Sequence, residues 1–474
     1  MAGYQGFGSF HSDNVEALVA QPAGDYAPPA RLPCEAALWD AAAAPPGFGA
    51  PMRAEFAIDP EWTFLNHGAF GAACRVAREA ARAWGEHAER QPLRFIDREL
   101  LPLQVAAIRA AARLVNCAPA NLVIVPNATY GLNVAIAAAA AGLRRGDTVY
   151  TLDVCYGSVK KMLAAACAAA GATLLVHPLR LPLAAAGGQA DIAAQVAASL
   201  PPGTALALFD HVASNTGLVL PLAELVPLAH ARGARVIVDG AHGAQSQPLD
   251  VARLGAEWYT TNCHKWLCAT RGVAVLYASD AVRAATRPVV ISHGYGDGFT
   301  SDFIWDGTRD YAGVVALPTL LRWWEWVGHD AARGYCRALL RDAVALLTGA
   351  WGTGTHAPLD CYSHMACVEL PAWALPPGAV APPGDGGDPA APPRRTATST
   401  HGKAVQDALH FHYRIEVPAK TLGAALYLRV SAAVYNTLDD YRRLADAVAS
   451  FAWAPDGAFT GGPAGALRGA DTGR

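Results

Sequence analysis

Residues 234–239 read ARVIVD, an apolar run that ends in an aspartate. Because neighbouring positions are apolar, the run is typical of a strand buried on both faces of a sheet. Helix-length segments separate it from six similar runs, which are NLVIVP (121–126), DTVYTL (147–152), ATLLVH (172–177), ALALFD (205–210), EWYTTN (257–262) and GVAVLY (272–277). This alternation predicts an α/β fold, with a mostly parallel seven-stranded sheet covered by helices.

The regions on either side of these runs differ in composition. Residues 1–46 are rich in Pro, Gly and Ala, which predicts a disordered or loosely packed extension. We expect 47–75 to lie near the active site and 76–316 to form the large domain. Long amphipathic patterns, two strand-like runs and a final helix predict a smaller α+β domain over 317–474, with a disordered Pro- and Gly-rich loop at 374–398.

Composition excludes several classes of function. The net charge of -3 leaves no basic patch for nucleic acid or an anionic membrane. The longest apolar stretches fall short of the roughly 18 residues that span a bilayer. The N-terminus lacks the features of a targeting segment. The ten cysteines show neither a CxxC pair nor a disulfide framework, so we expect a reducing, cytoplasmic setting and no metal site.

One lysine stands in an unusual setting. Only five of the 37 basic residues are lysines, and Lys265 lies between a histidine and a tryptophan in TTNCHKWL (260–267). An amine in a partly apolar pocket has its neutral form favoured and can condense with an aldehyde. Asp239, at the end of ARVIVD, is a costly carboxylate unless it faces a cation. Taken singly, Lys265 could be a surface lysine with a buried stem, and Asp239 could be a simple helix cap.

A further corner of the predicted sheet favours an anion. Asn127, Ala128 and Thr129 follow a strand and open a helix, whose free N–H groups and dipole attract negative charge, although an ordinary threonine cap would look the same. His264 could also donate to a phosphate. Ligands of such sheets bind beyond the carboxyl ends of the strands. Together with Lys265 and Asp239, these residues describe a phosphorylated aromatic aldehyde whose ring nitrogen needs a carboxylate, pyridoxal 5'-phosphate.

Six motifs also carry a family resemblance. They are FLNHGAFGA (64–72), NATYGLN (127–133), VDGAHGAQ (238–245), NCHKWL (262–267), WDGTRDY (305–311) and RVSAAVYNTLDDYRRL (429–444). In this order, over about residues 47–452, the chain resembles the class V aminotransferase family of fold type I. Within that family it is similar to the isopenicillin N epimerase-like branch, which includes plant-type cysteine desulfhydrases and hercynylcysteine sulfoxide lyases.

The resemblance implies roles for the residues of the predicted cofactor site. Lys265 would bond to the cofactor and carry the proton, and Asp239 would keep the pyridine nitrogen protonated. His242 would sit near the ring oxygen. Ala128, Thr129 and His264 would hold the phosphate, with Asn262 where relatives often have serine.

The resemblance also implies residues for the substrate and a partner chain. Thr308 would reach the phosphate of a second subunit, in a homodimer with shared active sites. Tyr156 would stack on the cofactor, although a core tyrosine is an alternative. Ser214, or the adjacent Asn215, would touch the ring oxygen. Two residues would meet an amino-acid substrate: Arg429, which could instead form a structural ion pair, and more weakly Asn66.

Several reactions remain open for such a site, because each begins with removal of the Cα proton by Lys265. Persulfide-forming desulfurases need a mobile cysteine shortly before the arginine strand, and residues 412–428 contain none. The segment YGSVKKM (156–162) resembles the desulfhydrases, so we favour β-elimination from cysteine or a cysteine S-conjugate. Epimerisation and transamination remain alternatives, and so does an inactive scaffold, although the presence of Lys265, Asp239 and Arg429 argues against the last.

Overall fold

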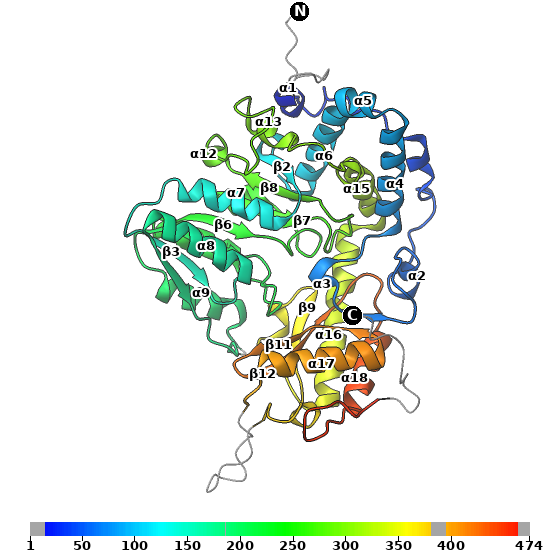
Figure 1. The fold of residues 1–474 in the computed structure, drawn as a ribbon, viewed down its shortest axis with the longest axis vertical. Helices are drawn as coiled ribbons and strands as arrows, with labels where there is room; N and C mark the ends of the chain where they lie inside the picture. The colour runs from blue at the N-terminus through cyan, green and yellow to red at the C-terminus, as the bar shows by residue number, and fades with distance from the viewer. Residues whose placement is uncertain (1–14, 185, 381–394, 463–474) are drawn as a thin grey trace, which may run out of the picture.

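The computed structural model describes residues 15–184, 186–380 and 395–462. Its largest sheet has seven strands in the order β2-β8-β7-β6-β5-β3-β4 (Figure 1). The strands are β2 (Leu122–Val125), β3 (Thr148–Leu152), β4 (Thr173–His177), β5 (Thr204–Asp210), β6 (Arg235–Asp239), β7 (Trp258–Asn262) and β8 (Ala274–Ala278). Each coincides with one of the seven predicted runs. Strand β8 runs in the direction opposite to the other six strands, so the prediction of a mostly parallel sheet is confirmed.

Helices cover both faces of this sheet, which explains the continuous apolar runs. Figure 1 shows α7 (Ala128–Ala140) and α8 (Gly157–Ala170) lying over one face. There Val123 and Val125 pack with Leu132 in one buried cluster. On the other face Ile124 belongs to a second cluster, to which α6 (Leu100–Val115) and α10 (Leu222–Ala231) contribute. Side chains of both orientations along a strand therefore lose contact with water, as a parallel sheet requires.

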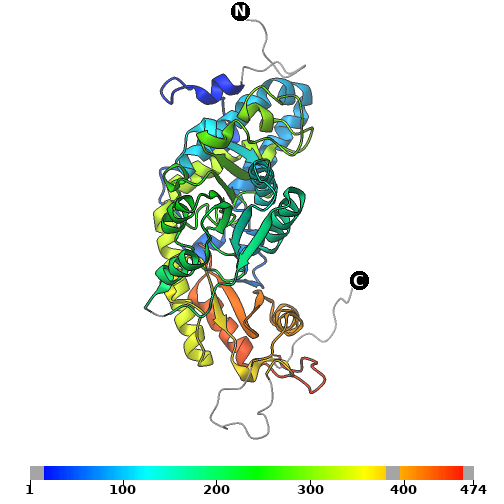
Figure 2. The ribbon, with the colours of Figure 1, turned by 90° about the vertical axis from the view of Figure 1, so that its left-hand side faces the viewer.

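The smaller domain is built on a three-stranded antiparallel sheet of order β11-β12-β9. Its strands are β9 (Met365–Glu369), β11 (Ala419–Leu422) and β12 (Ala425–Ser431), and its helices include α17 (Ser399–Tyr413) and α18 (Leu438–Ala449). Helix α16 (His329–Trp351) runs down one side of the molecule and connects the two domains (Figure 2). A short parallel pair, β1 (Thr63–Phe64) with β10 (Ile415–Glu416), attaches the N-terminal segment to the smaller domain.

The boundary expected at residue 316 comes too early. Helix α15 (Leu317–Val327) packs against α4 (Arg75–Arg90) and α6 of the large domain. Trp323 and Trp324 are fully buried there, and the Trp324 indole donates to the Leu267 carbonyl at 2.7 Å. Burial of these two rings ties α15 to the large domain. The transition therefore falls along α16, after the turn at Gly328.

Part of the expected N-terminal extension makes specific contacts with the large domain, although most of residues 21–46 are exposed or only partly buried. Helix α1 (Val15–Ala20) buries Val15 and Val19 against α6 and α13 (Phe299–Ile304). Arg109 donates to the Val19 carbonyl at 2.7 Å. These contacts link residues about 90 positions apart, so local composition alone could not indicate them. Residues 1–14 lie outside the described part of the chain.

The loop expected at 374–398 is shorter in the described structure. Residues on both sides of its centre are packed, and Val380 pairs with Arg395 in an isolated antiparallel bridge. Ala379 and Ala397 are buried near this bridge. The remainder of the predicted loop, 381–394, lies outside the described residues.

Candidate active site

A cleft of about 150 Å³ lies at the carboxyl-terminal edge of the large sheet. It is lined by residues that follow β2, β3, β5, β6 and β7, together with two from the N-terminal segment. They are Ala69, Phe70, Asn127, Ala128, Thr129, Leu132, Tyr156, Asp210, Val212, Ser214, Asp239, Ala241, His242, Asn262, His264 and Lys265. Nine of them are predicted site residues, because parallel strands deliver their ends to one edge.

One corner of the cleft is formed by the N-terminus of α7. Asn127 caps this helix by accepting from the Tyr130 N–H at 2.9 Å. The Ala128 N–H donates to the Asn262 side-chain oxygen at 2.9 Å and is therefore already engaged, in contrast to its expected free role. Among the described residues the buried His264 Nδ1 has no hydrogen-bond partner. A buried polar atom without a partner at a 13-residue helix N-terminus fits a phosphate group.

Two carboxylates stand side by side where strands β5 and β6 end. Asp210 pairs with Asp239 in the sheet register, and the two residues are only 3% and 4% exposed. Burial raises the pKa of both carboxyl groups, and the charge of Asp239 further raises the pKa of Asp210. Asp239 accepts from the Ala241 N–H at 2.9 Å and faces the cation of Lys265, which favours its charged form. Of the two, Asp239 has the hydrogen bond and the nearby cation that oppose the effect of burial, so the shared negative charge is favoured on Asp239 and the proton on Asp210.

Lys265 forms a chain of contacts with the residues beside it. Its Nζ lies 3.0 Å from His242 Nε2, and the Trp266 indole donates to His242 Nδ1 at 3.2 Å. Because Nδ1 accepts, the proton of the neutral imidazole belongs on Nε2, where it faces the amine. Burial lowers the pKa of His242 well below its usual value and that of Lys265 to about 8. Burial therefore raises the neutral fraction of the amine, and that neutral form can accept from His242.

Residues of the N-terminal segment contact the backbone around Lys265. His67 contacts the Lys265 carbonyl through Nε2 at 3.0 Å and the Tyr435 hydroxyl through Nδ1 at 2.8 Å. Gly71 has a φ of +67°, and a Cβ built there would lie 1.9 Å from the His264 carbonyl oxygen. Only glycine permits this close approach. The FLNHGAFGA motif therefore serves to hold the backbone turn that carries the amine.

Arg429 reaches the rim of the cleft from strand β12 of the smaller domain. It donates to the carbonyl and hydroxyl of Ser214 and, at 3.1 Å, to the Asn66 side-chain oxygen. The residue is only 3% exposed, yet no carboxylate lies within ion-pair distance of it among the described residues. Its Nε has no hydrogen-bond partner there either. The structural ion pair considered as an alternative is therefore absent from the described part of the chain.

Of the remaining predicted residues, some line the cleft and others do not. Tyr156, 45% exposed, lines the cleft at the start of α8. Ser214 lines it as well, whereas Asn215 does not and uses its carbonyl to accept from the Cys367 thiol at 3.4 Å. Thr308 lies in an exposed loop away from the cleft of its own chain.

Sequence reasoning missed other residues of the cleft, above all Asp210. The signal was available, because Asp210 ends the run ALALFD as Asp239 ends ARVIVD. Phe70, Leu132 and Val212 form apolar parts of the lining and had no distinguishing pattern. Among the described residues no cluster of three metal-ligating side chains occurs.

The family model for class V aminotransferases matches residues 104–372, more than half of the chain. The chain belongs to the class V aminotransferase family. Membership of this family confirms the resemblance and the cofactor expected from the sequence, pyridoxal 5'-phosphate. The geometry fits that molecule, since the unpartnered His264 nitrogen, the buried Asp239 and the Lys265 amine would meet its phosphate, ring nitrogen and aldehyde.

Similar family members include enzymes of two reaction types. A protein named putative L-cysteine desulfhydrase 1 from Oryza sativa subsp. japonica is 31% identical over 84% of this chain and 85% of its own. An isopenicillin N epimerase from Amycolatopsis lactamdurans is 29% identical over 84% of this chain and 97% of its own. The crystal structure of the cysteine desulfurase CsdA from Escherichia coli shares the fold, with a TM-score of 0.66 and 22% identity over 84% of this chain and 96% of that one.

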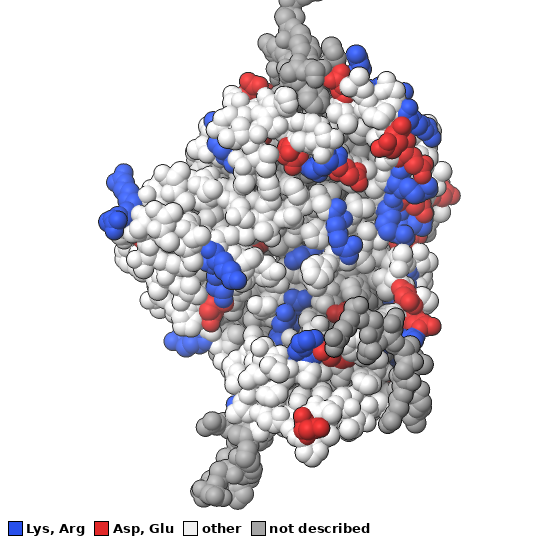
Figure 3. Space-filling view, in the orientation of Figure 1, with Lys and Arg blue, Asp and Glu red and all other residues white. Residues whose placement is uncertain are grey.

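Charged residues of both signs occur on the surface of the described chain. On the face drawn in Figure 3, basic and acidic residues are interspersed and most of the surface is neither. Within the described ranges, no helix combines the length and apolarity that a bilayer crossing needs.

Proposed function

We propose that this protein is a pyridoxal phosphate-dependent carbon–sulfur lyase. It would cleave cysteine or a cysteine S-conjugate with the uptake of water, releasing sulfide or the corresponding thiol together with pyruvate and ammonia. One observation carries the proposal most directly: the buried guanidinium of Arg429 lacks a carboxylate partner in the described chain and lies beside Ser214 at the cleft. A substrate carboxylate would supply the missing charge through two hydrogen bonds.

Lys265 is placed to act as the base. With its pKa lowered to about 8 by burial, a useful fraction of the amine is neutral near pH 7 and can accept the Cα proton. The cofactor, when bound, supplies an electron sink for the negative charge left on Cα. Asp239 stabilises that sink by offering a carboxylate to a ring cation. His242 directs its Nε2 proton toward the same region and so provides a neutral donor.

The cysteines around the site argue against a persulfide-forming desulfurase. Cys367 pairs with Arg429 in the sheet, is fully buried, and has its pKa raised by burial to about 12. Cys155 and Cys263 are also buried, with thiol pKa values raised by burial. A nucleophilic thiolate needs a lowered pKa and access to the substrate. No cysteine occurs in 412–428, so elimination is favoured over sulfur transfer to the protein.

The experiment is incubation of the holoenzyme with L-cysteine while sulfide and pyruvate are measured. Equal amounts of both products support elimination. Lys265→Ala should abolish turnover, whereas Lys161→Ala, which removes an exposed lysine of α8, should leave it unchanged. Absence of pyruvate from both L-cysteine and cysteine sulfoxide conjugates would rule out the proposed reaction.

Epimerisation is the second candidate, favoured by the similarity to an isopenicillin N epimerase. It needs a proton donor on the opposite face of the substrate, for which the cleft offers Tyr156 and the neutral Asp210. Incorporation of solvent deuterium at Cα without pyruvate would identify this reaction. Formation of a keto acid with transfer of the amino group to the cofactor would instead identify transamination.

We also propose a homodimer with shared active sites and a cytoplasmic setting. Thr308 lies in a loop braced by an Asp306–Arg309 ion pair at 2.8 Å, and its exposure leaves it accessible to a second chain. Sedimentation of the holoenzyme tests the dimer, and cofactor loss from Thr308→Val tests the shared site. All ten cysteines are free, which suits a reducing compartment.

A further inference from the structure

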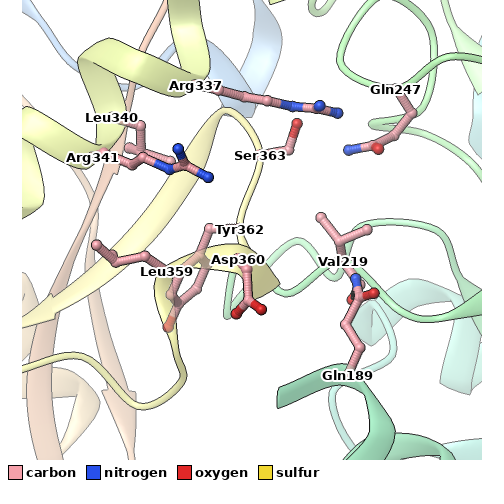
Figure 4. Close-up of a pocket in the computed structure, with 10 residues that line it drawn as sticks. All are labelled: Gln189, Val219, Gln247, Arg337, Leu340, Arg341, Leu359, Asp360, Tyr362 and Ser363. Atoms are coloured by element: carbon pink, nitrogen blue, oxygen red, sulfur yellow. Dashed lines mark hydrogen bonds between the residues drawn. The ribbon is translucent and has the colours of Figure 1, made fainter. Parts of the chain in front are cut away.

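A second cavity, of about 210 Å³, lies between the two domains and shares no residue with the cleft. Gln189 and Gln247 line it from the large domain, and Asp360 and Ser363 from the smaller one. Two arginines of α16, Arg337 and Arg341, stand one helical turn apart on its wall. Figure 4 shows Arg337 and Gln247 reaching toward each other, Arg341 pointing into the space, and Asp360 on the opposite side.

Arg337, Arg341 and Asp360 are exposed to solvent around this cavity, and its lining includes one buried polar atom without a partner among the described residues, the Gln247 amide nitrogen. Neither Arg337 nor Arg341 makes a hydrogen bond or an ion pair with any described residue. Gln247 is only 8% exposed, and its amide nitrogen is buried without a partner in the same part of the chain. In Figure 4 this nitrogen points into the cavity. A buried amide without a hydrogen bond is costly, so it indicates a group that is bound there in solution.

We propose that this cavity binds an acidic amino acid. Its two carboxylates would meet Arg337 and Arg341, with the Gln247 amide as an additional donor, and its ammonium group would meet Asp360. The lining has two positive charges and one negative charge, the reverse of an acidic amino acid at neutral pH. A guanidinium binds a carboxylate through parallel hydrogen bonds, which makes arginine the suitable residue type.

The cavity is connected to the active site through two hydrogen bonds. Ser363 on its wall donates to the Ser246 carbonyl at 2.8 Å, and Ser246 in turn donates to the His242 carbonyl. A ligand that contacts Gln247 and Arg337 at once would also join the two domains. Because Arg429 and Ser214 come from different domains, this ligand fixes the relative position of the substrate-binding groups.

Calorimetric titration of borohydride-reduced holoenzyme with L-glutamate tests the proposal, because reduction blocks Lys265 and needs no turnover. One glutamate should bind per chain, and more tightly than L-alanine or inorganic phosphate. Arg337→Gln and Arg341→Gln should each weaken binding about tenfold, since each removes a charge-assisted hydrogen bond. Arg333→Gln is the matched control, because Arg333 lies on the same helix but outside the cavity and pairs with Asp330.

A second variant tests the ammonium contact. Asp360→Asn should weaken L-glutamate several-fold but should not weaken succinate, which has two carboxylates and no amine. Retention of the cofactor absorbance before borohydride reduction shows that each variant is folded. The proposal is overturned if glutamate does not bind, if binding is insensitive to both arginine variants, or if phosphate binds as tightly as glutamate.

Discussion

The lowered pKa of Lys265 makes a quantitative prediction about the cofactor-free chain. With a pKa of about 8 in place of 10.5, the neutral fraction of the amine at pH 7 rises from about 0.03% to about 9%, roughly 300-fold. The cause is burial, opposed in part by the charge of Asp239. Since only the neutral amine attacks an aldehyde, capture of pyridoxal phosphate should show the same dependence on pH.

The assay is the rate of cofactor capture by the apo-protein between pH 6.5 and 10.5, followed by absorbance. An Nα-acetyl-lysine solution serves as the reference for an amine with an ordinary pKa, and Lys265→Ala accounts for capture at other lysines. We expect the rate to rise with pH and to reach half its maximum near pH 8. A midpoint above about pH 10, parallel to the reference amine, would refute the claim that burial favours the neutral form.

Four substitutions test other parts of the site. Asp210→Asn should change kcat/KM less than about threefold, because an amide replaces a protonated carboxyl group. Asp239→Asn should lower kcat/KM by about 10- to 150-fold and weaken cofactor binding, because it removes the negative charge. Equal effects of the two variants on kcat/KM would contradict the assignment of one negative charge, on Asp239, to this pair. Gly71→Ala should lower the melting temperature and release the cofactor, because the added Cβ would clash with the His264 carbonyl oxygen. A variant with the wild-type melting temperature and full cofactor content would refute this packing. Arg429→Gln should raise KM for cysteine about tenfold or more with a smaller change in kcat, and an unchanged KM in steady-state assays would exclude it as the carboxylate contact.

Much of the large domain could be predicted because its signals are local. Most of the seven strands are largely apolar runs, because the central strands are buried on both faces, whereas the edge strand β4 is only partly buried. The residues that follow these strands, such as Asp239 and Lys265, could be assigned to one edge because parallel strands share their direction. The class of cofactor followed from an anion corner, a carboxylate and an amine, in that order along the chain.

Other features depend on residues far apart in the chain, and only the tertiary structure decided them. The pKa of Asp210 is raised by its burial and then by the charge of Asp239, which the sheet register places beside it, and no local pattern reveals that pairing. Arg429 is a candidate carboxylate ligand because folding buries it without an ionic partner in the described chain, and ion pairing depends on three-dimensional proximity. Gln247 and Arg341 likewise face one cavity only because α16 crosses between the domains. Sequence specified the chemical groups through local patterns, whereas packing determined their neighbours and hence their charge.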